Sequence, residues 1–120
     1  MAHQIVWCDI PVTDLDRAIR FYSAVLRAPV RKEKFPEGSI GLLPFGEGEI
    51  GGCLYLSDEN RPSPNGPRIY LNVQGRMDEA VAAVRPNGGK VVKPSHPIGP
   101  YGFRAIIDDS EGNRVALHSP

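Results

Sequence analysis

The sequence predicts an α+β domain built from two tandem βαβββ modules whose sheets enclose a cleft. Three observations lead to this prediction: one order of elements occurs twice, the last strands of the two halves match in sequence, and a polar connector separates the halves. The first module is expected at 1–57, the connector at 58–67 and the second module at 68–120. A chain of 120 residues suits one core, so we expect a single domain, 1–120.

The first half begins with a strand and a helix. The segment IVWCDIPV (5–12) is rich in β-branched residues and predicts the strand. Thr13 and Asp16 have the spacing of a capping box, which predicts the start of the helix, and Pro29 ends it. The apolar stripe of this helix consists of Leu15, Ala18, Ile19, Tyr22 and Leu26. Three short strands follow at about 30–35, 39–45 and 50–57, separated by the turns FPEGS and FGEGE.

The second half repeats this order after the Pro-rich connector DENRPSPNGP. The segment RIYLNV (68–73) predicts a strand, and RPNGG ends the helix that follows it. The apolar stripe of that helix consists of Met77, Ala80, Val81 and Val84. KVVKP, FRAIID and NRVALHS then predict three more strands.

The closing strands of the two halves can be aligned without a gap. Laying GGCLYLS over NRVALHS sets Leu54 against Ala116, and Val12 and Val73 occupy matching places just before the two helices. Each half-sheet needs a partner for the face that its helix leaves open. Two curved sheets facing each other would enclose a cleft, and such a cleft is the usual ligand site.

Composition narrows the class of protein. The chain has 14 basic and 14 acidic residues and a net charge of zero, without the basic concentration that nucleic acids or anionic membranes require. No apolar run approaches the length of a membrane span and no signal-peptide core follows Met1, so we expect a cytoplasmic protein that binds neither nucleic acid nor membrane. Cys8 and Cys53 are expected as reduced, packed thiols, with a nucleophilic cysteine as the alternative.

Two motifs resemble a known group of proteins. IPVTDLDRAIRFYSAVL resembles the strand-to-helix signature of the vicinal oxygen chelate superfamily, which includes glyoxalase I, bleomycin and fosfomycin resistance proteins and extradiol dioxygenases. DDSEGNRVALHS resembles the closing motif of that superfamily, with Ser110 in place of the usual proline. The resemblance extends over nearly the whole chain and is specific for the fold rather than for a reaction. It implies paired βαβββ modules and a homodimer.

The resemblance also implies where a metal would be held. In the metal-using members, four ligands come from the first and fourth strands of each module, and these positions map to Trp7, Leu54, Arg68 and Ala116. None of these side chains suits a divalent cation, which prefers His, Cys, carboxylate or other oxygen ligands. The charge of Arg68 opposes a cation directly. We therefore expect no metal and no cofactor.

Strand alternation identifies the side chains expected in the cleft. The predicted ligand-binding residues are Trp7, Asp9, Leu54, Arg68, Tyr70, Asn72, Ala116 and His118. Aromatic area with a few polar groups suits a planar or amphipathic small molecule. Arg68 is the best anchor for a carboxylate or phosphate, since a guanidinium binds either group through two hydrogen bonds.

Each candidate also has a structural alternative. Trp7 is either a core residue or a surface on which a flat ligand stacks. Asp9 and Arg68 either pair with each other or contact the ligand. His118 is either a solvated strand-end residue or a base. His96, in the Pro- and Gly-rich loop PSHPIGPYGF, either takes part in acid–base chemistry or lies in a rigid turn.

We therefore expect a metal-free small-molecule-binding protein of the bleomycin-resistance type. The alternative is a glyoxalase-related lyase or isomerase, or a dioxygenase-like enzyme, in which Asp9, His96 or His118 acts as the base. In a third hypothesis these three side chains converge on a divalent ion at a non-standard metal site. The sequence leaves open whether the modules pair within one chain or between the two chains of a homodimer.

Overall fold

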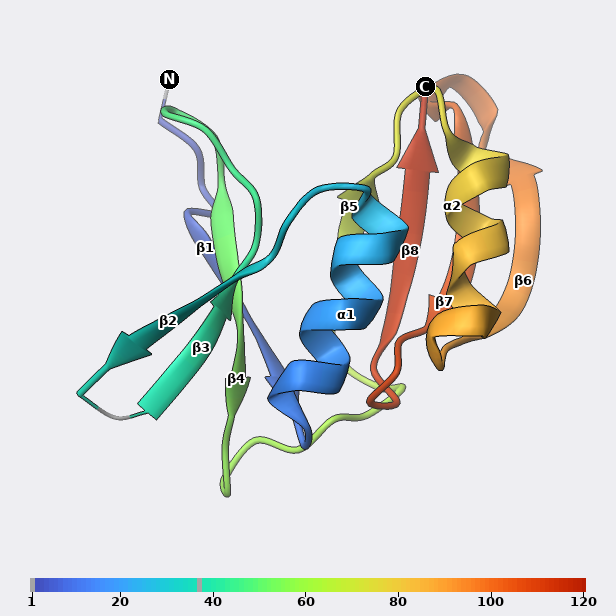
Figure 1. Cartoon of the computed structure of the whole chain (residues 1–120). Helices are drawn as coiled ribbons and strands as arrows, with labels where there is room; N and C mark the ends of the chain where they lie inside the picture. Colours follow the sequence, from blue (N-terminus) through green and yellow to red (C-terminus); the bar gives the residue numbers. More distant parts are fainter. Residues whose placement is uncertain (1, 37) are drawn as a thin grey trace.

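The structure, a computed structural model, describes residues 2–36 and 38–120. Its first half contains β1 (Trp7–Val12), α1 (Leu15–Leu26), β2 (Arg31–Phe35), β3 (Gly38–Leu42) and β4 (Gly51–Leu56). Its second half contains β5 (Tyr70–Asn72), α2 (Met77–Val84), β6 (Lys90–Pro97), β7 (Phe103–Asp108) and β8 (Arg114–Ser119). The order βαβββ occurs twice, which confirms the predicted fold class (Figure 1). Met1, and Glu37 in the predicted turn FPEGS, lie outside the described residues.

Each half forms its own four-stranded mixed sheet. The strand orders are β1-β4-β3-β2 and β5-β8-β7-β6. In both sheets the strand before the helix pairs in parallel with the last strand of its half, and the other pairs are antiparallel. Figure 1 shows α1 between the two sheets, with α2 beside it on the second sheet.

One hydrophobic core joins the two halves. α1 packs against β3 and β4, α2 packs against β6, β7 and β8, and the helices pack against each other. The core includes Ile10, Phe21, Val25, Leu54, Leu71, Val84, Ile107 and Leu117. Gly89 permits the close contact between the halves, because a Cβ there would lie 2.5 Å from Phe21 Cε1. No helix in the described part of the chain is long and apolar enough to cross a membrane.

The start of α1 differs from the prediction. Asp14 is the N-cap, and its carboxylate accepts a hydrogen bond from a backbone N–H of the first turn at 3.0 Å. Asp16 instead forms an ion pair with Lys32 at 3.0 Å, so the predicted capping box of Thr13 and Asp16 is wrong. Thr13 is bound by a side chain distant in sequence, Glu111.

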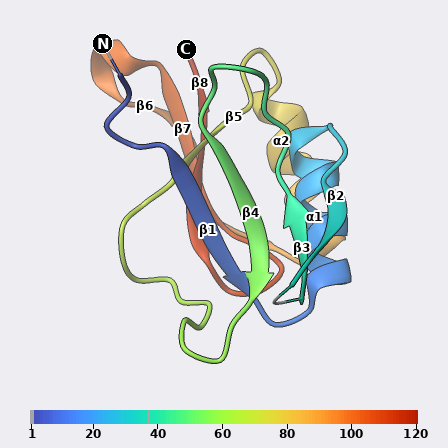
Figure 2. The same ribbon diagram turned by 90° about the vertical axis from the view of Figure 1, so that its left-hand side faces the viewer.

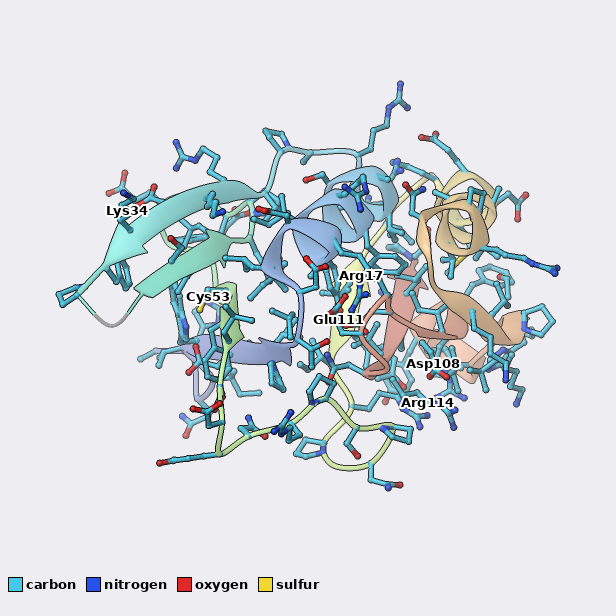
Figure 3. All side chains as sticks on the ribbon, turned by 60° about the horizontal axis from the view of Figure 1, so that its bottom comes forward. Arg17, Lys34, Cys53, Asp108, Glu111 and Arg114 are labelled. Carbon is cyan, nitrogen blue, oxygen red and sulfur yellow. The ribbon has the colours of Figure 1, made fainter. Side chains whose placement is uncertain are left out.

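The turn between β7 and β8 holds the start of α1. Glu111 in this turn has a fully buried side chain, and its Oε1 accepts hydrogen bonds from the backbone N–H groups of Thr13 and Asp14, both at 2.9 Å. Arg17 donates to Oε2 at 2.7 Å (Figure 3). Burial alone would raise the pKa of Glu111, but these bonds, with one from Ser110, outweigh it and lower the pKa to about 2. The second half thus caps the helix of the first.

The same turn makes a second set of contacts to the first half. The Tyr22 hydroxyl of α1 donates to Asp109 Oδ2 at 2.6 Å, and both residues are buried. Asp109 also accepts from the backbone N–H groups of Glu111 and Asn113 and from the Asn113 side chain. The Asn113 amide donates as well to the carbonyl of Pro11 in β1 at 2.8 Å. The closing motif DDSEGN therefore binds the two halves together.

The strand register corrects the alignment of the two closing strands. Asp9 pairs with Cys53, whereas Tyr70, the counterpart of Asp9 in the second half, pairs with Ala116. Cys53, rather than Leu54, is therefore the counterpart of Ala116. A slip of one residue transfers a side chain to the other face of a sheet. Leu54 is accordingly 0% exposed in the core, and the prediction that it faces a cleft is wrong.

β6 is longer than predicted from KVVKP. It continues to Pro97 and pairs with β7, so His96 lies on a strand opposite Arg104 and its predicted place in a loop is wrong. The register shifts between Val91 and Lys93 and again between Lys93 and His96. Because β6 is an edge strand, it tolerates prolines that would break the pairing of a central strand.

Candidate functional site

Each sheet has one face packed on the helices and a second face, called here its open face. The register places Trp7, Asp9, Cys53 and Tyr55 on the open face of the first sheet. It places Tyr70, Asn72, Arg104, Ile106, Ala116 and His118 on the open face of the second sheet. Figure 2 views β1 and β4 from the open side of the first sheet, with α1 and α2 at the right of the picture.

Trp7 is a fixed aromatic surface on the first open face. The residue is 43% exposed, and its Nε1–H donates to Asp9 Oδ1 at 2.8 Å. The ring meets Phe45 edge to face, with centroids 5.8 Å apart. Gly51 leaves the space for this arrangement, since a Cβ there would lie 2.9 Å from Trp7 Cζ3. Trp7 is therefore available to a ligand rather than part of the core.

The two thiols are held in their protonated form. Burial, and then the hydrogen bond to Asp9 at 3.3 Å and the charge of that carboxylate, raise the pKa of Cys53 to about 11. Burial and the charge of Asp9 also raise the pKa of Cys8. A thiol with a raised pKa is a poor nucleophile at neutral pH. These environments favour the interpretation of both cysteines as packed thiols. Figure 3 shows Cys53 on β4, well apart from Arg17 and Glu111.

Arg104 is central to the second open face. Its Nη1 donates to the Tyr70 hydroxyl at 2.8 Å, and its Nε and Nη2 lie 3.2 and 3.1 Å from His96 Nε2. Since a guanidinium only donates, His96 Nε2 must be the unprotonated nitrogen. The Nδ1–H of His96 then donates to the carbonyl of Pro94 at 2.8 Å. Both nitrogens of His96 are thus engaged.

His118 lies beside Arg104 and Tyr70. It is the register partner of Arg104, and its ring centroid is 6.2 Å from that of Tyr70. Its Nε2–H donates to the backbone carbonyl of Tyr101 at 2.6 Å. Tyr70, His96, Arg104 and His118 are called here the Arg104 cluster.

Nothing in the sequence marks Arg104 as a site residue, although the alternation along its strand indicates which face of the sheet it occupies. In FRAIID (103–108), Ala105 and Ile107 are buried in the core. Strand alternation then places Arg104 and Ile106 on the open face. The pairing with His96 has no such signal, because it depends on the irregular register of β6.

Two further predicted ligand contacts are Arg68, which precedes β5, and Asn72, which ends it. Arg68 is exposed, and no ion pair among the described residues joins it to Asp9, so the alternative of an Asp9–Arg68 pair is not realised. Asn72 Oδ1 accepts from the backbone N–H of Gln74 at 2.9 Å and supports the turn before α2. Ala116 is 0% exposed between its neighbouring strands and offers a ligand little surface.

The side chains at the family's metal positions do not fit a divalent metal. The Trp7 indole and the Arg68 guanidinium present N–H donors rather than lone pairs, and Ala116 has no donor atom. Cys53, which is the open-face residue paired with Asp9, retains its proton, whereas a thiol must lose it to bind a metal.

The three side chains of the hypothetical non-standard metal site are divided between the two sheets. Asp9 lies on the first sheet, and His96 and His118 lie on the second. Within residues 2–36 and 38–120, no three His, Cys, Asp or Glu side chains are grouped so that they could hold a metal ion.

Two surface cavities lie away from the predicted contacts. One, of about 430 Å³, lies at the start of α2 and is lined in part by Arg76 and Phe103. The other, of about 270 Å³, lies on the first sheet and is lined in part by Phe35 and Tyr55. Each is lined by one half of the chain, so neither is a cleft enclosed by both sheets.

Known proteins share this fold. The sequence model of the Glyoxalase/Bleomycin resistance protein/Dioxygenase superfamily matches residues 4–117, whereas no curated protein matches the chain. A glyoxalase/bleomycin resistance protein from Albidiferax ferrireducens T118 is similar with a TM-score of 0.74 at 18% identity, over 98% of this chain and 99% of that one. A fosfomycin resistance protein from Listeria monocytogenes is similar with a TM-score of 0.67 at 17% identity, over 100% and 95%. The trypanothione-dependent glyoxalase I of Leishmania major gives 0.64 at 22% identity, over 98% and 87%.

Proposed function

The chain belongs to the glyoxalase/bleomycin resistance protein/dioxygenase superfamily, and from this premise we propose that it is a metal-free small-molecule-binding protein. Its ligand is an aromatic or amphipathic molecule held against the open sheet faces. The observation that carries the proposal is the pair of half-exposed, fixed aromatic rings, Trp7 at 43% and Tyr70 at 45% exposure. Asp9 orients the first ring and Arg104 the second, so little conformational entropy is lost when a flat ligand stacks on either.

A second copy of the chain completes the site in this proposal. Open sheet faces that expose aromatic side chains are unusual for a monomer. Trp7 is exposed on the first open face and Tyr70 on the second. These aromatic surfaces favour a homodimer in which the open faces of the two chains meet. The cleft expected from the sequence would then form between chains.

The hydrogen bonding favours binding over catalysis. The carboxylate of Asp9 accepts from an indole N–H and a thiol, and both nitrogens of His96 are engaged. An acid–base role would require one of these groups to exchange partners on binding substrate. The free thiols Cys8 and Cys53 support our proposal that the protein acts in the cytoplasm.

Trp7 provides the test, because it is the single tryptophan of the chain. We expect a screen of small aromatic and amphipathic molecules to yield ligands that change Trp7 fluorescence and raise the melting temperature in a saturable way. Tyr70→Ala should weaken these ligands about tenfold, in line with the loss of one aromatic contact. Glu59→Ala, at an exposed position in the connector, is the control and should leave affinity unchanged.

The metal-free part of the proposal is tested by measuring the metal content of the purified protein. We expect the purified protein to contain no stoichiometric metal, and Zn²⁺, Ni²⁺, Mn²⁺ and Fe²⁺ to leave the melting temperature unchanged. A stoichiometric ion, or a saturable metal-induced shift, would contradict the metal-free assignment. A screen without any saturable ligand would contradict the binding function itself.

A further inference from the structure

We propose that Arg104 anchors the carboxylate of a small aromatic acid on the open face of the second sheet. This inference rests on the proposed binding function and adds the charge and chemical class of the ligand. Its basis is a guanidinium that is held in a defined orientation by neutral groups only.

The charge of Arg104 is not compensated by a carboxylate of the described residues. The ion pairs found there involve Arg17, Arg27, Lys32, Arg76 and Arg114. The partners of Arg104 are the Tyr70 hydroxyl and the unprotonated nitrogen of His96, which are both neutral.

Asp108, the acid on the same face of β7, does not neutralise Arg104. Asp108 is held by Arg114 through bonds of 2.8 and 3.2 Å, which Figure 3 shows side by side at the far end of β7 and β8. Lys93, the register partner of Ile106 on the same face, adds a further positive charge. The face around the Arg104 cluster is therefore net positive and attracts an anion.

The hydrogen bonds of Arg104 leave it free to make a two-pronged contact. Each terminal nitrogen of a guanidinium carries two N–H groups. Nη1 uses one on Tyr70 and Nη2 uses one on His96, which leaves one N–H on each terminal nitrogen. A carboxylate pairs with an arginine through two parallel N–H donors. Because Tyr70 and His96 already fix the side chain, binding costs little rotamer entropy.

The surroundings of Arg104 define the body of the ligand. Half-exposed Tyr70 lies on β5, two strands from β7, with its hydroxyl bound to Arg104, and Ile106 follows Arg104 on the same face of β7. A planar aromatic body would stack on Tyr70 while its carboxylate reaches Arg104. The first open face cannot hold the same group, since Asp9 would repel it.

The test uses two ligands of equal size, 2-naphthoate and its neutral amide 2-naphthamide. Their affinities are measured by calorimetry, and the Nε–H resonance of Arg104 is followed by NMR. We expect wild-type protein to bind the acid at least about tenfold more tightly than the amide, and to shift the Arg104 resonance. Arg104→Gln should abolish this preference. Arg31→Gln, which removes the same charge from an exposed position on β2, should preserve it.

Two further variants test whether Arg104→Gln loses the preference for the acid through a disturbed structure rather than through the lost guanidinium. Tyr70→Phe retains both the ring and the charge and frees a further N–H of Arg104, so the preference for the acid should persist. Arg104→Lys retains the positive charge but lacks the paired N–H donors of a guanidinium. It should therefore prefer the acid over the amide less strongly than wild type does. Equal affinity for acid and amide in wild type would overturn the carboxylate anchor and leave the binding function standing. If neither molecule binds wild type, the anchor is also overturned, and the Trp7 screen decides the binding function separately.

Discussion

The two open faces have the same strand arrangement and different chemistry. On the first, Asp9 and Cys53 pair across β1 and β4, and Asp9 accepts a hydrogen bond from the indole of Trp7. On the second, the equivalent pair is Tyr70 and Ala116, and the guanidinium of Arg104 lies on the next strand. One face therefore presents a carboxylate and the other a cation.

The helix-covered faces of the two sheets do not differ in this way. Ile10 and Leu54 in the first sheet correspond to Leu71 and Leu117 in the second, and all four lie in the core. Burial permits only apolar side chains there, because an unpaired polar group would cost free energy. The open faces are free of this constraint, so the same backbone presents different binding groups in its two copies.

The halves also differ in how their helices begin. Backbone N–H groups at the start of α1 donate to the carboxylates of Asp14 and Glu111, whereas the N-cap residue of α2, Arg76, makes no side-chain capping bond. The acidic residue Glu79 in the first turn of α2 is half-exposed. The β7–β8 turn thus caps the helix of the first half rather than the helix of its own half.

Among the substitutions that test this difference between the halves, Asp109→Ala should lower the free energy of unfolding most. Asp109→Ala leaves Tyr22 and the donors of Glu111 and Asn113 without their buried acceptor. We expect the free energy of unfolding to fall by about 3–4 kcal/mol in urea titrations. The matched control is Asp108→Ala, one residue earlier, which breaks only the partly exposed pair with Arg114 and should cost much less. Equal losses in both variants would mean that the closing turn does not join the halves.

Replacement of Glu111 should have the next largest effect. Glu111→Gln removes the charge that receives hydrogen bonds from Arg17 and two backbone N–H groups. We expect a loss of about 1–2 kcal/mol in the free energy of unfolding. The corresponding change in the second half, Glu79→Gln, affects a carboxylate that is 51% exposed and should cost about 0.5 kcal/mol or less.

The pH dependence of the Glu111 effect checks its cause. The pKa of Glu111 is about 2 in the folded protein, against an ordinary value of 4.5. Below pH 4.5 the unfolded chain therefore binds the proton first, so this stabilisation is complete above pH 4.5 and is lost as pH falls toward 2. The difference in melting temperature between wild type and Glu111→Gln should shrink over that interval. A difference that stays constant down to pH 2 would assign the effect to packing.

The smallest effect concerns the thiol of the first open face. Because the pKa of Cys53 is about 11, against an ordinary value of 9.0, alkylation by iodoacetamide at pH 8 should be about a hundredfold slower than in urea. Asp9→Asn should raise the rate only slightly, since burial is the main cause of the shift. Peptide mass spectrometry gives the rate at Cys53. Rapid modification of the native protein would show that the open face carries a reactive thiol.

The sequence alone predicted the elements and most of the first open face. Period-two alternation placed Trp7 and Asp9 correctly on one face of β1, because that pattern is local to one strand. It likewise placed Tyr70 and His118 together on the second sheet. It could not assign the counterpart of Ala116, since the alignment of two apolar strands tolerates a slip of one residue.

Only the tertiary structure decided which distant groups meet. The irregular register of β6 brings His96 to Arg104, and the packing of α1 beside the second sheet brings Glu111 to the start of that helix. These contacts depend on the positions of separate strands and helices, which no local spacing encodes. The sequence by itself therefore determined the repeated βαβββ order and the aromatic character of its strands. The register, the cap on α1 and the cluster around Arg104 come from packing the two halves on one core.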